Sequence, residues 1–252
     1  MENRLGWGAA VLLLAFAGSA SLPAQTTLLA EPFDVDLGEM NAANDGAGTN
    51  AWTFDSTCPA TALAGHTIAG TAHWINPTTC LDYGTEGSSD LLTSDVIDVS
   101  DCRGGVEVRF NYYLDFQESD EYDRARALVR LDGGTDVVVA ANHGGGGGER
   151  PAGDGGSNPP SLFELENDAT WRSVAVIVPG SENASQAQLA FVGETEDGIA
   201  NSGEGFLIDD VEVICRPAAY EVPALDGAGL AALVALLAAA ALVAMARRRR
   251  NA

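Results

Sequence analysis

The sequence predicts an all-β fold, an antiparallel jelly-roll sandwich, and two observations support this prediction. Between Leu28 and Cys215, apolar and polar residues alternate in short runs that turn residues separate. No segment of this range has the apolar stripe of an amphipathic helix. Many strands at short spacing, without helices between them, are typical of sandwiches and jelly rolls.

The chain opens with a predicted secretory signal peptide, residues 1–24. Arg4 precedes an apolar stretch at residues 9–17, and small residues follow at positions 18–20. A charged start, an apolar middle and a small-residue cleavage site are typical of such peptides. Residues 25–216 are therefore predicted to be exported and to form one sandwich domain.

The strands of this domain follow from period-two patterns. The run VEVRFNYYLDF (106–116) places apolar side chains at alternate positions, as a strand with one buried face requires. The run ARALVRL (125–131), the turn DGG (132–134) and the run TDVVVAA (135–141) predict a hairpin. The runs that continue the series are TWRSVAVIVP (170–179), QAQLAFVGE (186–194) and GFLIDDVEVIC (205–215).

Residues 142–168 interrupt this series. They contain five consecutive glycines, at positions 144–148, and show no periodicity. Glycine loses more conformational freedom on ordering than any other residue. A flexible loop is therefore predicted over the whole of 142–168.

The C-terminal part predicts a membrane anchor. Residues 217–226 form a linker, and Gly227–Ala246 is a stretch of 20 residues without one charge. As a helix, this stretch would be about 30 Å long, which matches the hydrocarbon thickness of a bilayer. Four arginines then begin the tail of residues 247–252 and favour a cytoplasmic location for it.

The composition excludes one class of partner. The chain has 13 Lys+Arg against 36 Asp+Glu, a net charge of −23, and all its basic residues are arginines. Such a surface repels polyanions, so no nucleic acid is expected as a partner. The excess of acids fits a surface that attracts divalent cations, and it also fits one that only stays soluble in salt.

The four cysteines all lie in the exported segment. An even number in an oxidising compartment predicts two disulfides, and three pairings satisfy that count. We predict a local bridge between Cys58 and Cys80. A second bridge, between Cys102 and Cys215, would join an early strand to the last one.

Several segments occur in an order that resembles bacterial MAM-like and carbohydrate-binding-module-like jelly rolls. They are AEPFD (30–34), LLTSDVIDVS (91–100), the strand at 106–116, YDRARALVRLDGG (122–134), WRSVAVIVP (171–179), QLAFVGET (188–195) and GEGFLIDDVEV (203–213). The resemblance covers nearly the whole exported segment. It implies a binding module with a structural calcium that links the first strand to the last.

The resemblance places the calcium ligands at Glu31 and Asp34 in the first segment and at Asp209 or Asp210 in the last one. Adjacent residues of a strand point to opposite faces, so Asp209 or Asp210 is expected to face the core. A buried carboxylate there would need a cation or hydrogen-bond donors. The alternative is that one aspartate accepts backbone N–H groups while the other faces water.

Aromatic residues offer a candidate sugar-binding surface. Trp52, Trp74 and Tyr83 lie in the loop-rich first third and are predicted to be exposed rings. Trp171 and one of the neighbours Tyr112 and Tyr113 are instead expected in the core, because they lie in predicted strands.

The sequence predicts no catalytic residue. His66, His73 and His143 belong to no nucleophile or zinc motif. A glycosidase needs two carboxylates across the sugar bond, and the acidic run that contains Glu118 lacks the closing glutamate of the glycosidase pattern. A solvated acidic turn is the preferred interpretation of this run.

The tail resembles the exosortase-type sorting signals of Gram-negative bacteria, of the PEP-CTERM and IPTL-CTERM kind. These signals combine a short motif, an apolar span and an arginine cluster. Val222, Pro223, Ala224 and Leu225 stand where the IPTL-type motif would be. The resemblance implies an exosortase-like processing enzyme as a partner, and a permanent anchor is the alternative.

Three functional hypotheses follow. The preferred one is a non-enzymatic binding or adhesion module that recognises carbohydrate at the cell surface or in the extracellular matrix. The others are a structural envelope protein without a specific ligand and a cell-surface glycosidase.

Overall fold

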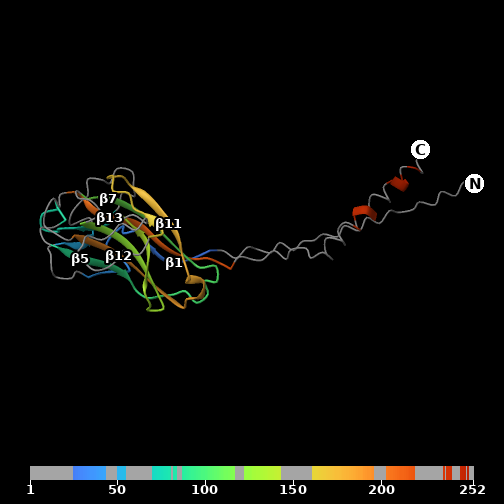
Figure 1. The fold of residues 1–252 in the computed structure, drawn as a ribbon, viewed down its shortest axis with the longest axis horizontal. Coiled ribbons are helices and arrows are strands. Elements are labelled where there is room, and N and C mark those ends of the chain that lie inside the picture. The colour runs from blue at the N-terminus through green and yellow to red at the C-terminus, as the bar shows by residue number, and fades with distance from the viewer. Residues whose placement is uncertain are drawn as a thin grey trace, which may run out of the picture.

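The computed structural model describes residues 25–43, 50–54, 70–80, 82–83, 87–116, 122–142, 161–195 and 203–218, and helical residues at 235, 237–239, 245–247 and 249. These residues confirm the predicted all-β sandwich. Two sheets form the layers of the domain (Figure 1). A single large cluster of buried apolar side chains lies between them.

Sheet A, marked by β7, β13 and β11 in Figure 1, has six strands in the order β11-β7-β13-β4-β3, and β1 also pairs with β13. Its strands are β1 (Thr26–Glu31), β3 (Ala51–Phe54), β4 (Ala72–Ile75), β7 (Val106–Asp115), β11 (Arg172–Val178) and β13 (Gly205–Cys215). All of its described strand pairs are antiparallel.

Sheet B has seven strands in the order β10-β9-β8-β12-β5-β2, and β6 pairs with β12. Its strands are β2 (Met40–Ala43), β5 (Ser88–Ser94), β6 (Ile97–Asp98), β8 (Asp123–Leu131), β9 (Asp136–Ala141), β10 (Phe163–Glu164) and β12 (Gln186–Thr195). The predicted hairpin is confirmed as β8 and β9, with Asp132 and Gly133 at positive φ in the turn. A short 3-10 helix, η2 (Ser181–Asn183), lies between β11 and β12.

The predicted alternation holds along β7. Its inward residues belong to the core and are at most 2% exposed: Val106, Val108, Phe110, Tyr112 and Leu114. The residues between them face away from the core. This outer face of sheet A carries the groove described below.

The predicted loop at 142–168 is partly wrong. Residues 143–160 lie outside the described residues, but Phe163 and Glu164 form β10, which pairs with β9 in parallel. Leu165 is 2% exposed and belongs to the core. Phe163 and Leu165 are two apolar residues at strand spacing, and burying them against the sandwich favours an extended conformation.

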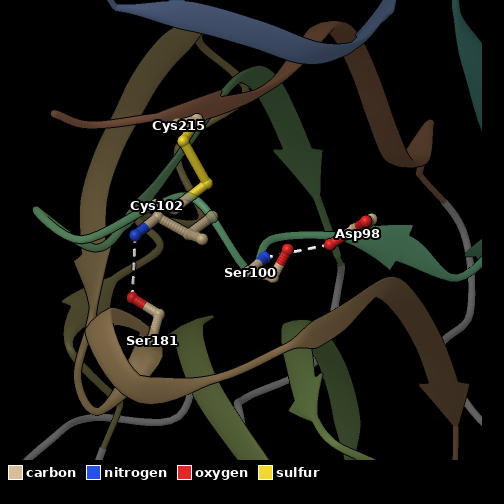
Figure 2. Close-up of a disulfide and its surroundings, with 6 residues drawn as sticks. Asp98, Ser100, Cys102, Ser181 and Cys215 are labelled. Carbon is tan, nitrogen blue, oxygen red and sulfur yellow. Dashed lines mark hydrogen bonds between the residues drawn. A yellow bond between two sulfur atoms is a disulfide. The ribbon is translucent and has the colours of Figure 1, made fainter.

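The predicted bridge between Cys102 and Cys215 is confirmed (Figure 2). It joins the segment before β7 to the last residue of β13. Cys80 is also disulfide-bonded. Cys58 lies outside the described residues, so the Cys58–Cys80 pairing stays a prediction.

The predicted targeting segments fall largely outside the described residues. These are the signal peptide (1–24), the motif at 222–225 and most of the span 227–246. Helical conformation appears at Ala235, Leu237–Ala239 and Met245–Arg247. In the described part of the chain, no helix is both long enough and apolar enough to cross a membrane.

Candidate functional site

The three rings predicted to be exposed are buried, so this prediction is wrong. Trp52 is 4% exposed, and Trp74 and Tyr83 are 0% exposed. The Trp74 indole donates a hydrogen bond to Asp90 Oδ2 (2.8 Å), and the Tyr83 hydroxyl donates one to Asp123 Oδ2 (2.8 Å). These rings therefore fill the core and supply donors to buried carboxylates.

The predicted calcium ligands do not gather into one cluster. Among the described residues, no group of three or more His, Cys, Asp or Glu side chains is placed to hold a metal ion. Glu31 accepts the N–H groups of Phe33 (3.1 Å) and Glu39 (2.9 Å), so its carboxylate closes the loop that follows β1. Asp34 is exposed. Calcium binding stays a prediction, which melting curves with and without a chelator would test.

Asp209 and Asp210 do not point to opposite faces as predicted, because a β-bulge interrupts β13. Asp209 pairs with Asn111 of β7, and Glu212 pairs with Arg109. The two residues between Asp209 and Glu212 therefore oppose a single residue of β7, and alternation fails at this point. Asp210 takes a φ of 48°, in the left-handed region.

The bulge gives the two aspartates separate roles on the outer side of sheet A. Asp209 is fully buried, and its Oδ1 accepts the N–H of Asp210 (2.7 Å). Asp210 is half-buried, and its Oδ2 accepts a hydrogen bond from Asn111 Nδ2 (2.9 Å). The core position expected for one of them belongs to Val211, which is 0% exposed.

Asp210 lies in a groove on the outer face of sheet A. The groove has a volume of about 430 Å³. Its described lining residues come from β7, β11 and β13: Arg109, Phe110, Asn111, Ser173, Val174, Ala175, Asp210 and Glu212. Pockets of a few hundred Å³ with a few convergent polar groups are typical of small-ligand sites.

A hydrogen-bond chain crosses the floor of this groove. The Ser173 hydroxyl donates to Asn111 Oδ1 (2.5 Å), and Asn111 Nδ2 donates to Asp210 Oδ2. The Asn111 amide thus connects all three strands. Its orientation is fixed at both ends, which preorganises the polar groups of the groove.

Two aromatic rings stand at one end of the groove. Tyr113 lies two residues after Asn111 on β7, and Trp171 lies two residues before Ser173, just ahead of β11. Two residues of extended chain span about 7 Å. Their ring centroids are 5.8 Å apart, with 50° between the planes. Tyr113 is 8% exposed, and Trp171 is partly exposed. Tyr112 lies in the main core, as one of the two tyrosines was expected to. Trp171 lies outside the main core and packs, partly buried, against a small second cluster of Tyr113 and Leu207.

The Tyr113 hydroxyl stays protonated. Burial raises the pKa of Tyr113 to about 12, and the nearby carboxylates of Glu204, Asp115 and Asp168 act in the same direction. Tyr113 therefore contributes a neutral ring. This buried ring packs against the partly exposed ring of Trp171.

The arginines next to the groove already have carboxylate partners. Arg109 Nε lies 2.6 Å from Glu107 Oε1. Arg172 Nη2 lies 2.7 Å from Glu166 and 2.5 Å from Asp168. The hydrogen bond from Arg172 lowers the pKa of Asp168, which stays ionised.

Of the three histidines and Glu118 considered above, the structure describes only His73. His73 is 1% exposed, and its Nε2 hydrogen-bonds the carbonyl oxygen of Glu204. His66, His143 and Glu118 lie outside the described residues.

The strained backbone of Asp210 predicts a difference between two substitutions. Asp210→Gly keeps the left-handed conformation without steric cost, whereas Asp210→Ala puts a Cβ there without a compensating polar contact. We expect the glycine variant to be more stable than the alanine variant by about 1 kcal/mol in urea unfolding. Equal stabilities would contradict the assigned conformation.

No protein-family model matches the chain, and neither does any curated protein. Some solved structures are similar to the chain at low sequence identity. A CBM61 module in complex with β-1,4-galactotriose is 12% identical, with a TM-score of 0.40, over 70% of this chain and 88% of that one. The CBM22-1 xylan-binding domain of Paenibacillus barcinonensis Xyn10C is 12% identical, with a TM-score of 0.37, over 77% and 98%.

A third structure is the K1 adhesin domain of Lys-gingipain from Porphyromonas gingivalis. It is 16% identical, with a TM-score of 0.39, over 75% of this chain and 97% of that one. At these identities and scores, the likeness does not decide what this chain binds.

Proposed function

We propose that this protein is a non-enzymatic carbohydrate-binding module that holds its ligand in the groove on the outer face of sheet A. The observation that carries the proposal is the combination of a polar groove of about 430 Å³ with the Tyr113–Trp171 ring pair at its end. A glycan presents C–H faces and hydroxyl groups together, and this groove offers a complement to each.

The apolar complement is the partly exposed indole of Trp171. A flat aromatic face buries C–H surface at little entropic cost, because the ring has few rotatable bonds. Packing against Tyr113 limits its rotamers further. A sugar ring seated on Trp171 would be directed along the strands toward Asn111 and Ser173.

The polar complement is the groove floor. Sugar hydroxyls both donate and accept hydrogen bonds, and the floor supplies both kinds of partner. Arg109 and the Asn111 amide contain donors, while Asp210 and Glu212 accept. Because the cations near the groove are ion-paired, acidic glycans find less attraction here than uncharged ones.

The exported location is part of the proposal. The disulfide between Cys102 and Cys215 supports it, since structural disulfides persist in oxidising compartments. We propose that the signal peptide directs export from a Gram-negative cytoplasm and that the tail either anchors the protein or is read at Val222–Leu225 by an exosortase-like enzyme. Intact mass of the protein recovered from cells separates these two fates, because only an anchor retains the four terminal arginines.

A glycan array with the folded exported domain, residues 25–218, tests the function. We expect saturable binding to one class of glycan, and no change in the length of the bound chains. Silence across the array would favour the structural envelope protein. Turnover that disappears in Glu118→Gln would favour the glycosidase.

A further inference from the structure

The charged side chains of the groove indicate which class of glycan it would bind. Arg109 is the one cationic side chain among the described lining residues. Glu212 lies directly across the strand pair from Arg109, yet the guanidinium binds Glu107 instead. The second carboxylate oxygen of Glu107 lies 3.8 Å from Arg216 Nε. The positive charge of Arg109 is therefore neutralised by Glu107 and not by Glu212.

Glu212 lines the groove. It is half-buried, and none of the described cationic side chains forms an ion pair with it. The bulge places Asp210, a second carboxylate, in the same groove. Arg172, the first residue of β11, is bound by Glu166 and Asp168 and brings no uncompensated charge.

We propose that this groove selects glycans that carry free amino groups, such as glucosamine units, with Glu212 as the partner of the ammonium. The proposal rests on the carbohydrate-binding function proposed above and names the ligand class for the same groove. An ammonium that donates to a partly buried carboxylate forms a charge-assisted hydrogen bond, roughly twice as strong as a neutral one. An acetylated amine has no charge and gains only the neutral bond.

The net charge of −23 also attracts cationic ligands at long range, and it would do so for any site on the surface. The test must therefore separate the effect of the groove residues from the effect of the net charge of the whole molecule. Glu164 provides the matched control, because it is exposed and lies on β10 of sheet B. Glu164→Gln and Glu212→Gln change the net charge equally, but only the second changes the groove.

The test compares two glycans of equal length by titration calorimetry, a chitosan hexasaccharide and its fully acetylated chitin counterpart, at mildly acidic pH where the sugar amines are protonated. We expect the wild-type exported domain to bind the chitosan oligomer about tenfold more tightly, with a preference that weakens as salt is added. Glu212→Gln should remove most of this preference, and Glu164→Gln should leave it unchanged.

Four results would overturn the inference. Equal affinity for the two oligomers would show that the amine is not read. An equal loss in Glu164→Gln and Glu212→Gln would assign the preference to the net charge rather than to the groove. Binding of neutral glycans alone, lost in Trp171→Ala, would reject the amino-glycan class and leave the proposed function intact. Failure of every glycan to bind would reject both proposals.

Discussion

Replacing Trp171 by alanine is expected to weaken glycan binding by about 30-fold, or about 2 kcal/mol. Trp171 is the partly exposed ring at the end of the groove, and Tyr113 holds it at a centroid distance of 5.8 Å. Removing the indole deletes the apolar surface on which the sugar ring would stack. Only the polar contacts of the groove floor would then remain. Isothermal titration with the glycan found on the array gives the change directly.

Two further variants separate binding from folding. Trp171→Phe keeps an apolar ring on Tyr113 and should retain part of the affinity. Tyr122→Ala removes another exposed aromatic side chain, just before β8 of sheet B, and should bind as the wild type does. If Trp171→Ala is folded by circular dichroism and binds normally, the groove is not the binding site.

The sequence predicted those strands that bury only one of their two faces. Along β7 every second residue enters the core, and the pattern of VEVRFNYYLDF shows this without a structure. The hairpin of β8 and β9 was readable for the same reason, because turn residues separate two alternating runs. Hydrophobic periodicity is a property of the sequence itself, so these elements did not require knowledge of tertiary contacts.

The buried tryptophans were missed because their strands have no such pattern. β4 is four residues long and buried at every position, so its sequence AHWI does not alternate. The packing of Trp74 also depends on a distant residue: a Cβ at Gly193 of β12 would lie 2.2 Å from the Trp74 indole. A glycine more than a hundred positions away gives no local sign that it makes room for a ring.

The groove was missed for a related reason. Its central carboxylate, Asp210, occupies a bulge, and an inserted residue shifts the alternation of everything that follows it in β13. Strict alternation placed one aspartate in the core, where Val211 lies instead. The outward parity of Arg109, Asn111 and Tyr113 was visible in the sequence, but the strands that flank β7 were not. Only the pairing of β7 with β11 and β13 brings Ser173 and Glu212 beside Asn111.

Removing the bridge between Cys102 and Cys215 is expected to have the largest effect on stability. The two cysteines are 113 residues apart, and closing a loop of about that length restricts the unfolded chain by about 4.7 kcal/mol in the chain-entropy model. We expect Cys102→Ala/Cys215→Ala to lose about 3–5 kcal/mol in urea unfolding, which lowers the Tm by about 10 °C for a domain of this size.

The folded state should change little in this variant, because other contacts fix the same strand ends. Gly104 N–H donates to the carbonyl of Arg216 (3.0 Å), and Arg216 N–H donates to the carbonyl of Gly105 (2.9 Å). The Ser181 hydroxyl oxygen accepts the N–H of Val106 (2.8 Å), and the Ser100 N–H binds Asp98, in the surroundings shown in Figure 2. The effect should therefore arise mainly in the unfolded state, whose expansion increases the exposed surface and raises the m-value.

Glycan binding provides a control for this variant. The groove lies on β7, β11 and β13, and the variant keeps all three strands. Its glycan affinity, at a temperature where it is folded, should therefore match that of the wild type. A loss below about 1 kcal/mol with an unchanged m-value would show that the bridge does not restrict the unfolded chain in the way proposed.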